Sequence, residues 1–116
     1  MTLKSEQCDQ IAIFDWLRLN KLDHISFHVA NERATKINTG RLLKRMGVTA
    51  GVSDLFIMRA REGFHGLIIE LKAKSGRLSR SQQVFLDNMT LEGYKALVCY
   101  GFDETIWVIK KYLGMH

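Results

Sequence analysis

The sequence of 116 residues lacks several features that define particular classes of protein. It contains no proline, and no apolar run approaches the roughly 20 residues of a membrane-spanning helix, which argues against membrane insertion. Its first ten residues are too polar for a secretory signal peptide, so we expect the protein to stay in the compartment where it is made. It also lacks internal repeats, low-complexity segments and linker-like stretches, which favours a single domain over residues 1–116.

Cysteine is scarce and has no pattern that indicates a site. Cys8 and Cys99 lie far apart and lack the spacing of metal ligands. In a chain without a signal peptide, two such residues are interpreted as reduced, structural thiols. A chain of this length can bury enough surface to fold without disulfides.

The charge balance is basic, with 17 Lys and Arg residues against 12 Asp and Glu residues, a net charge of +5. Contacts with phosphates release counterions and provide affinity that does not depend on base sequence. The excess raises the expectation of a polyanionic partner such as nucleic acid, but alone it is weak evidence, because many small basic proteins bind no nucleic acid.

Hydrophobic periodicity and cap residues predict an α/β fold with a mixed sheet of about four strands flanked by helices. A strand–helix–strand passage late in the chain requires a crossover, which places two strands in parallel. The expected helices span residues 5–20, 79–93 and 103–113, with a short basic helical segment within 35–47. The expected strands span residues 24–29, 53–59, 66–73 and 95–100.

The expected strand 66–73 places two charged residues in an aliphatic run. Side chains alternate along a strand, so Glu70 and Lys72 share one face. The other face carries Leu67, Ile69 and Leu71. One interpretation is a half-exposed strand with a solvated polar face. The other is a site, because Asp54 begins the neighbouring strand and two converging carboxylates require a cation between them.

Two further polar residues allow both a structural and a functional interpretation. Gln82 completes an S-x-x-Q capping box with Ser79, yet it also opens the core-facing stripe of its helix. Glu6 lies one turn before Gln10 on the inward stripe of the first helix. It is either an acid favoured by the helix dipole or a member of the site.

These residues form the pattern G-x-x-D, about fifteen residues, E-x-K, and then L-S-x-x-Q. The pattern resembles the PD-(D/E)XK nuclease superfamily and, within it, the VRR-NUC family. The segment H-V-A-N-E-R at 28–33 is similar to an H-x-x-N-E segment of compact phage and bacterial members. The matching residues are Gly51, Asp54, Glu70, Leu71, Lys72, Gly76, Leu78, Ser79 and Gln82. Ser53 stands where the superfamily has its proline, a residue without a chemical role.

The resemblance implies a restriction-endonuclease-like core and a metal-dependent site. Asp54, Glu70 and the main-chain carbonyl of Leu71 would hold Mg²⁺, with Mn²⁺ able to replace it. The cation would polarise the scissile phosphate and lower the pKa of a bound water. No Ser–His or Cys–His arrangement indicates a covalent intermediate.

The remaining site residues receive roles from the same resemblance. Lys72 would orient or deprotonate the attacking water, or neutralise charge that develops on phosphorus. Gln82 would hold the water or a phosphate oxygen, and Glu6 would support a second metal. Phosphate-backbone contacts are expected from basic and polar residues on both sides of the site. They are Asn31, Arg33, Lys36, Arg41, Lys44, Arg45, Lys74, Arg77 and Arg80.

The resemblance further implies a homodimeric DNA endonuclease that acts on branched DNA such as four-way junctions, and we expect it in the cytoplasm of a bacterial or phage-infected cell. Two alternatives remain open. One is a catalytically inactive DNA-binding module of the same fold, and the other is a structural α/β domain whose acids form surface ion pairs.

Overall fold

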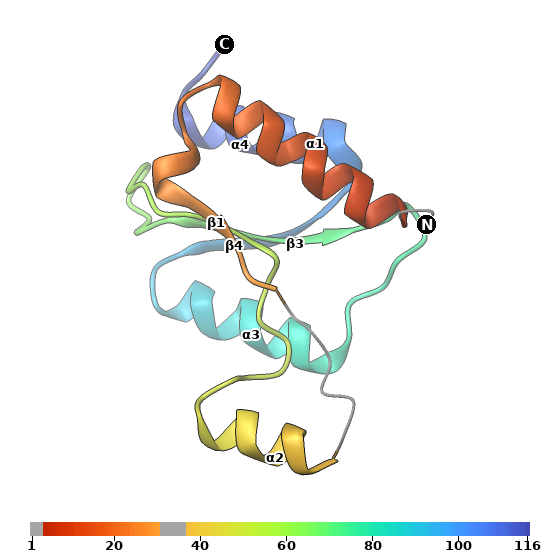
Figure 1. The fold of residues 1–116 in the computed structure, drawn as a ribbon. Coiled ribbons are helices and arrows are strands. Elements are labelled where there is room, and N and C mark those ends of the chain that lie inside the picture. Colours follow the sequence, from red (N-terminus) through yellow and green to blue (C-terminus); the bar gives the residue numbers. More distant parts are fainter. Residues whose placement is uncertain (1–3, 31–36) are drawn as a thin grey trace.

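The protein is built around a central sheet with helices on both faces (Figure 1). The computed structural model describes residues 4–30 and 37–116, with only the main chain described for 37–39. Helices α1 and α4 cover one face, α3 covers the other, and α2 lies beyond α3 (Figure 1). Their bounds are Ser5–Leu19 for α1, Ile37–Arg45 for α2, Arg80–Leu91 for α3 and Gly101–Leu113 for α4.

The sheet has the strand order β1-β2-β3-β4 among the described residues. The first two pairings are antiparallel, and β3 and β4 are parallel because α3 provides the crossover between them. This arrangement confirms the predicted α/β class and mixed sheet. The bounds are Ser26–His28 for β1, Leu55–Ile57 for β2, Leu67–Lys72 for β3 and Lys95–Tyr100 for β4.

Two strands are much shorter than the sequence predicts, and β3 is shorter by one residue at each end. Strand β1 has three residues because a 3₁₀ turn, Asp23–Ile25, occupies the start of the expected strand. Strand β2 also has three residues, and its ladder to β3 covers only Leu55–Ile57. Asp54 therefore lies just before β2, outside that ladder.

The predicted helix ends are confirmed where a cap residue marks them. Ser79 caps α3, and the chain leaves that helix through Gly93, whose φ is +94°. The ambiguous basic segment forms α2, after which Gly47 has a φ of +97°. Helix α4 begins two residues earlier than expected, at Gly101.

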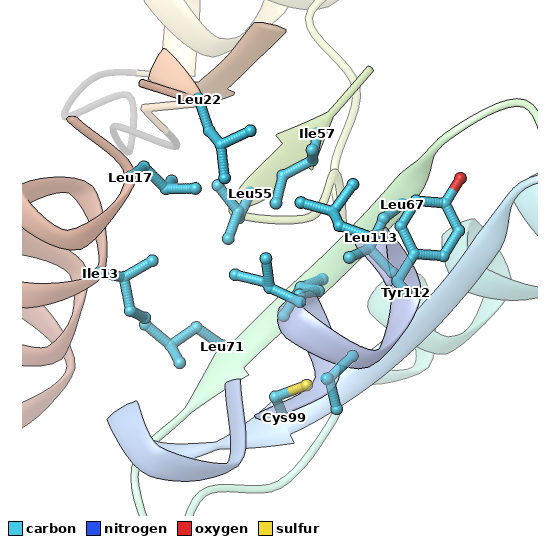
Figure 2. Packing of buried hydrophobic residues seen from close by; sticks show 13 residues of the cluster. Ile13, Leu17, Leu22, Leu55, Ile57, Leu67, Leu71, Cys99, Tyr112 and Leu113 are labelled. Carbon is cyan, nitrogen blue, oxygen red and sulfur yellow. The ribbon is translucent and has the colours of Figure 1, made fainter. Parts of the chain in front are cut away.

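The hydrophobic core lies between the sheet and the pair α1 and α4 (Figure 2). Leu67, Ile69 and Leu71 of β3 belong to it, as the alternation predicts. The opposite face of β3 is also covered, because Ile68 is 1% exposed and Glu70 is 2% exposed. The interpretation of that face as solvated is therefore wrong: α3 packs over it (Figure 1).

The two cysteines are free and have different environments. Cys99 lies in the core, and burial raises the pKa of its thiol to about 12, which fits the prediction of an inert structural residue. Cys8 is also free but is exposed and lies outside the core.

Among residues 4–30 and 37–116, no helix combines the length and the hydrophobicity needed to cross a bilayer.

Candidate active site

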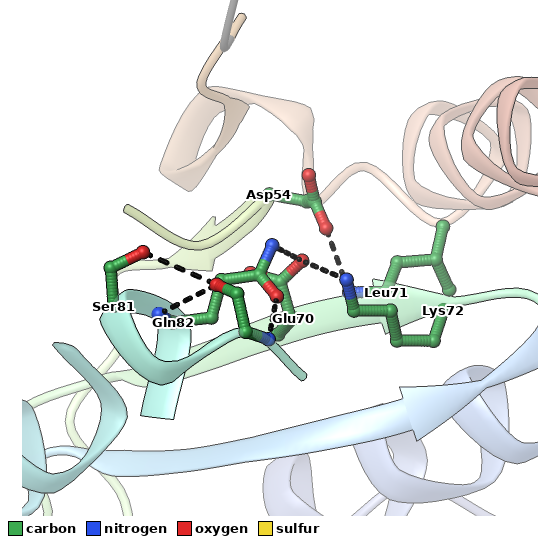
Figure 3. Close-up of polar contacts among 7 residues, drawn as sticks. Asp54, Glu70, Leu71, Lys72, Ser81 and Gln82 are labelled. Carbon is green, nitrogen blue, oxygen red and sulfur yellow. Dashed lines mark hydrogen bonds and ion pairs between the residues drawn. The ribbon is translucent and has the colours of Figure 1, made fainter. Parts of the chain in front are cut away.

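Asp54 meets β3 through a hydrogen bond from the main chain. The N–H of Leu71 donates to Oδ2 of Asp54 over 2.8 Å (Figure 3). In a strand the N–H and C=O of one residue point to the same side, so the carbonyl of Leu71 also faces the side on which Asp54 lies. The structure therefore brings together Asp54 and Leu71, two of the three residues from which the sequence predicts a metal site.

Glu70 is a buried carboxylate with incomplete hydrogen bonding. Its Oε2 accepts from Nε2 of Gln82 over 3.3 Å and lies 3.8 Å from Nζ of Lys72 (Figure 3). Its Oε1 is buried and has no hydrogen-bond partner among the described residues. Burial, and then the neighbouring Asp54 carboxylate, raise the pKa of Glu70 to about 8, while Lys72 opposes the rise.

A divalent cation fits this donor set. The ammonium of Lys72 does not offset the effect of burial and of the Asp54 carboxylate on Glu70, and one oxygen of Glu70 stays unsatisfied among the described residues. Among the described residues, no three or more His, Cys, Asp or Glu side chains form a group that could hold a metal alone. Mg²⁺ commonly binds through one or two carboxylates and takes its other ligands from water and substrate phosphates, whereas Zn²⁺ requires more side chains.

The side-chain amide of Gln82 has two partners at once. Its Oε1 accepts from the N–H of Ser79 over 2.9 Å, and the N–H of Gln82 donates to Oγ of Ser79 over 3.2 Å, which completes the capping box. Its Nε2 meanwhile donates to Glu70. The structural and the functional interpretation of Gln82 are therefore compatible, because they use different ends of the amide.

Gly51 explains the glycine of the G-x-x-D pattern. Its φ is +82°, and a Cβ at this position would lie 2.3 Å from the carbonyl oxygen of Ser81. Only glycine allows the loop that leads to Asp54 to contact the backbone of the first turn of α3. Because Gln82 directly follows Ser81, the contact joins the loop of Asp54 to the helical turn that carries Gln82.

Lys72 is held close to the site by the turn that follows β3. Its side chain is 12% exposed. A Cβ at Gly76 would lie 3.2 Å from Cδ of Lys72, so this glycine leaves room for the lysine stem. The lysine of the E-x-K pattern and Gly76 therefore pack against each other.

Glu6 approaches the site from the first turn of α1, where the helix dipole also favours an acid. It lines a pocket of about 420 Å³ that reaches Asp54 and Leu71 from the α1 side. The described lining residues are Glu6, Gln7, Gln10, Ile11, His28, Asp54 and Leu71. Glu6 thus lines the same pocket as Asp54 and Leu71, the two predicted metal-site residues that face it.

The sequence-based assignment of site residues missed His28. Its ring nitrogen Nδ1 lies 2.8 Å from the main-chain oxygen of Asp54, and its side chain lines the same pocket. The signal was present in the H-x-x-N-E segment, which begins with this histidine, but a lone histidine in a short strand indicates no specific role.

The predicted DNA-binding residues form two exposed groups in the structure. Lys74, Arg77 and Arg80 lie in the connection after β3 and at the start of α3, close to the site. Arg41, Lys44 and Arg45 lie on α2, on the far side of α3 from the sheet (Figure 1). The other three predicted residues, Asn31, Arg33 and Lys36, lie outside the described residues.

Comparisons with known proteins agree with this fold. The sequence pattern of the VRR-NUC domain matches residues 5–103. A solved structure described as a VRR-NUC domain protein is similar, with a TM-score of 0.85 and 30% identity, over 99% of this chain and 93% of that one. No curated protein matches. The chain therefore belongs to the VRR-NUC domain family, whose fold and nuclease character the resemblance predicted.

Proposed function

We propose that this protein is a divalent-metal-dependent DNA endonuclease that hydrolyses phosphodiester bonds. The main support is Glu70: a carboxylate that is 2% exposed, with one unpartnered oxygen among the described residues, beside a second carboxylate. Such an arrangement destabilises a protein unless a bound cation uses it. Its place at the E-x-K pattern of a nuclease-family domain favours a catalytic cation over a structural one.

Asp54, Glu70 and the carbonyl of Leu71 would hold Mg²⁺, and Mn²⁺ would be able to replace it. Bound there, the cation would polarise the scissile phosphate and lower the pKa of a water ligand. The hydrogen bond from Leu71 N–H fixes the Asp54 carboxylate, and Gln82 fixes one oxygen of Glu70. The unpartnered oxygen of Glu70 is thereby left for the cation.

Lys72 is the candidate to position or deprotonate the attacking water, or to neutralise charge on phosphorus. Its ammonium lies next to Glu70, and its stem is enclosed by the following turn. The amide of Gln82 has a second hydrogen that is not used on Glu70, which can hold the water or a phosphate oxygen. Glu6, across the pocket, would support a second cation.

We infer that the substrate is branched DNA, such as a four-way junction, and that the enzyme acts as a homodimer in the cytoplasm of a bacterial or phage-infected cell. Basic residues both at the site and on α2 support contact with more than one stretch of phosphate backbone. Self-association is supported by exposed apolar side chains on and after α2, with Leu42 and Val48 each 54% exposed and Met46 70% exposed. A two-fold dimer would present two sites to two strands.

The deciding experiment is a cleavage panel with Mn²⁺ or Mg²⁺ on single-stranded, duplex, flap and four-way-junction DNA, with light scattering to give the oligomeric state. We expect Glu70→Ala and Lys72→Ala to abolish cleavage, and Lys110→Ala on α4, a matched lysine change away from the site, to leave it intact. Salt-sensitive binding without cleavage would instead indicate an inactive DNA-binding module. Neither binding nor cleavage would indicate a structural domain.

A further inference from the structure

His28 donates a hydrogen bond to the main chain of Asp54. A main-chain carbonyl can only accept, so the 2.8 Å contact requires the proton on Nδ1 of the ring. The N–H of Val29 donates to the same oxygen over 3.0 Å. Both lone pairs of the Asp54 carbonyl are thus occupied by donors from the end of β1.

The hydrogen bond from His28 matters because, among the described residues, few other contacts hold the main chain of Asp54 in place. The ladder between β2 and β3 covers Leu55–Ile57, so Asp54 is not held by strand pairing on that side. On its other side the chain arrives through a loop that contains Gly51 and its left-handed turn. The orientation of the Asp54 peptide therefore depends on the two donors from β1, and that orientation directs the carboxylate toward Leu71.

We propose that His28 is a positioning residue for Asp54. The ring bond fixes the Asp54 peptide so that its carboxylate accepts from Leu71 N–H and lies beside Glu70, where it can share a cation. The inference rests on the proposed function, because it takes Asp54 as a metal ligand. His28 acts through that ligand and needs no contact with DNA.

Two substitutions separate the hydrogen bond from the ring itself. His28→Asn places an amide nitrogen where Nδ1 lies and can keep the bond to Asp54. His28→Gln keeps a polar side chain but moves its amide one bond farther, where it cannot replace Nδ1. His24→Gln, in the 3₁₀ turn before β1, is the matched control because His24 is exposed and is not part of the pocket lining.

The measurements are the Mn²⁺ dissociation constant by calorimetry, kcat at saturating Mn²⁺, and the melting temperature. We expect His28→Gln to weaken Mn²⁺ binding about tenfold and to lower kcat, as for other residues that orient metal ligands. His28→Asn should recover most of both losses, and His24→Gln should match the parent. A ¹⁵N NMR spectrum of the parent should show the His28 ring protonated on Nδ1.

The outcomes distinguish this inference from the function on which it rests. If the parent binds no Mn²⁺ and cleaves no DNA, the proposed function fails. If the parent binds Mn²⁺ and cleaves DNA but His28→Gln equals it in both, only the positioning role of His28 is overturned. A fall in melting temperature with unchanged metal affinity would also overturn it, because that result describes a residue that only stabilises the end of β1.

Discussion

The amide of Gln82 donates to the carboxylate of Glu70 over 3.3 Å while its oxygen completes the cap of α3. One side chain thus couples the start of a helix to the orientation of a buried carboxylate on a strand. Because Nε2 occupies only Oε2 of Glu70, Oε1 remains without a partner among the described residues. The cap and the site therefore depend on the same residue but on different atoms.

Gln82→Ala and Ser79→Ala separate these two roles. Each removes one half of the capping box and should lower the free energy of unfolding by about 1 kcal/mol. Only Gln82→Ala also removes the donor to Glu70, so only it should lower the cleavage rate markedly. Urea unfolding and single-turnover cleavage of the same preparations test this prediction. Equal loss of cleavage in the two variants would show that Gln82 contributes through the cap alone.

Glu70→Gln should change the pH dependence of stability. Because the pKa of Glu70 is raised from 4.5 to about 8, the folded protein binds more protons than the unfolded chain between those values. The free energy of unfolding of the metal-free parent should therefore fall, relative to Glu70→Gln, as pH rises through this window. The difference should reach a few kcal/mol once Glu70 is ionised in the folded state.

Urea unfolding in a chelating buffer at several pH values from about 5 to about 9 measures that difference. In a buffer without chelator, added Mn²⁺ should stabilise the parent at the alkaline end and leave Glu70→Gln nearly unchanged, because the substitution removes a proposed ligand. A constant difference between the two proteins across this range would contradict the raised pKa.

Gly51→Ala should be more costly than the same change at Gly47. Both glycines have positive φ, so alanine pays about 1 kcal/mol of backbone strain at either position. At Gly47 the new Cβ would meet nothing within 4 Å, whereas at Gly51 it would lie 2.3 Å from the backbone of Ser81. We expect at least about 2 kcal/mol of additional destabilisation in Gly51→Ala, together with loss of cleavage. Similar unfolding free energies for the two variants would show that the loop can move away from α3 without cost.

Arg41→Gln combined with Lys44→Gln should weaken DNA binding through charge alone. Each lost phosphate contact should lower the slope of log affinity against log salt by about one, with little change between DNA sequences. The matched control is Lys110→Gln combined with Lys111→Gln on α4, which lies on the opposite side of the sheet (Figure 1). Fluorescence anisotropy at several salt concentrations measures both slopes, and equal slopes would mean that only the net charge of the protein matters.

Much of the fold could be predicted because its signals are local. Ser79 and Gly93 mark the ends of α3 through backbone capping and a left-handed turn, which need only neighbouring residues. Alternation along β3 correctly assigned Leu67 and Leu71 to the core, because strand geometry fixes the period at two. The lengths of β1 and β2 could not be predicted from the sequence, because pairing with other strands decides where a strand ends.

The sequence by itself determined the types of the elements and the polar residues that the strand 66–73 and its following helix contribute. Only the tertiary structure decided that α3 buries the face of Glu70, that Gly51 lets the Asp54 loop contact Ser81, and that His28 reaches Asp54. Periodicity and caps act over a few residues, whereas these contacts join segments far apart in the chain. The distances within these contacts, and with them the raised pKa of Glu70, depend on how the helices pack on the sheet and how its strands pair.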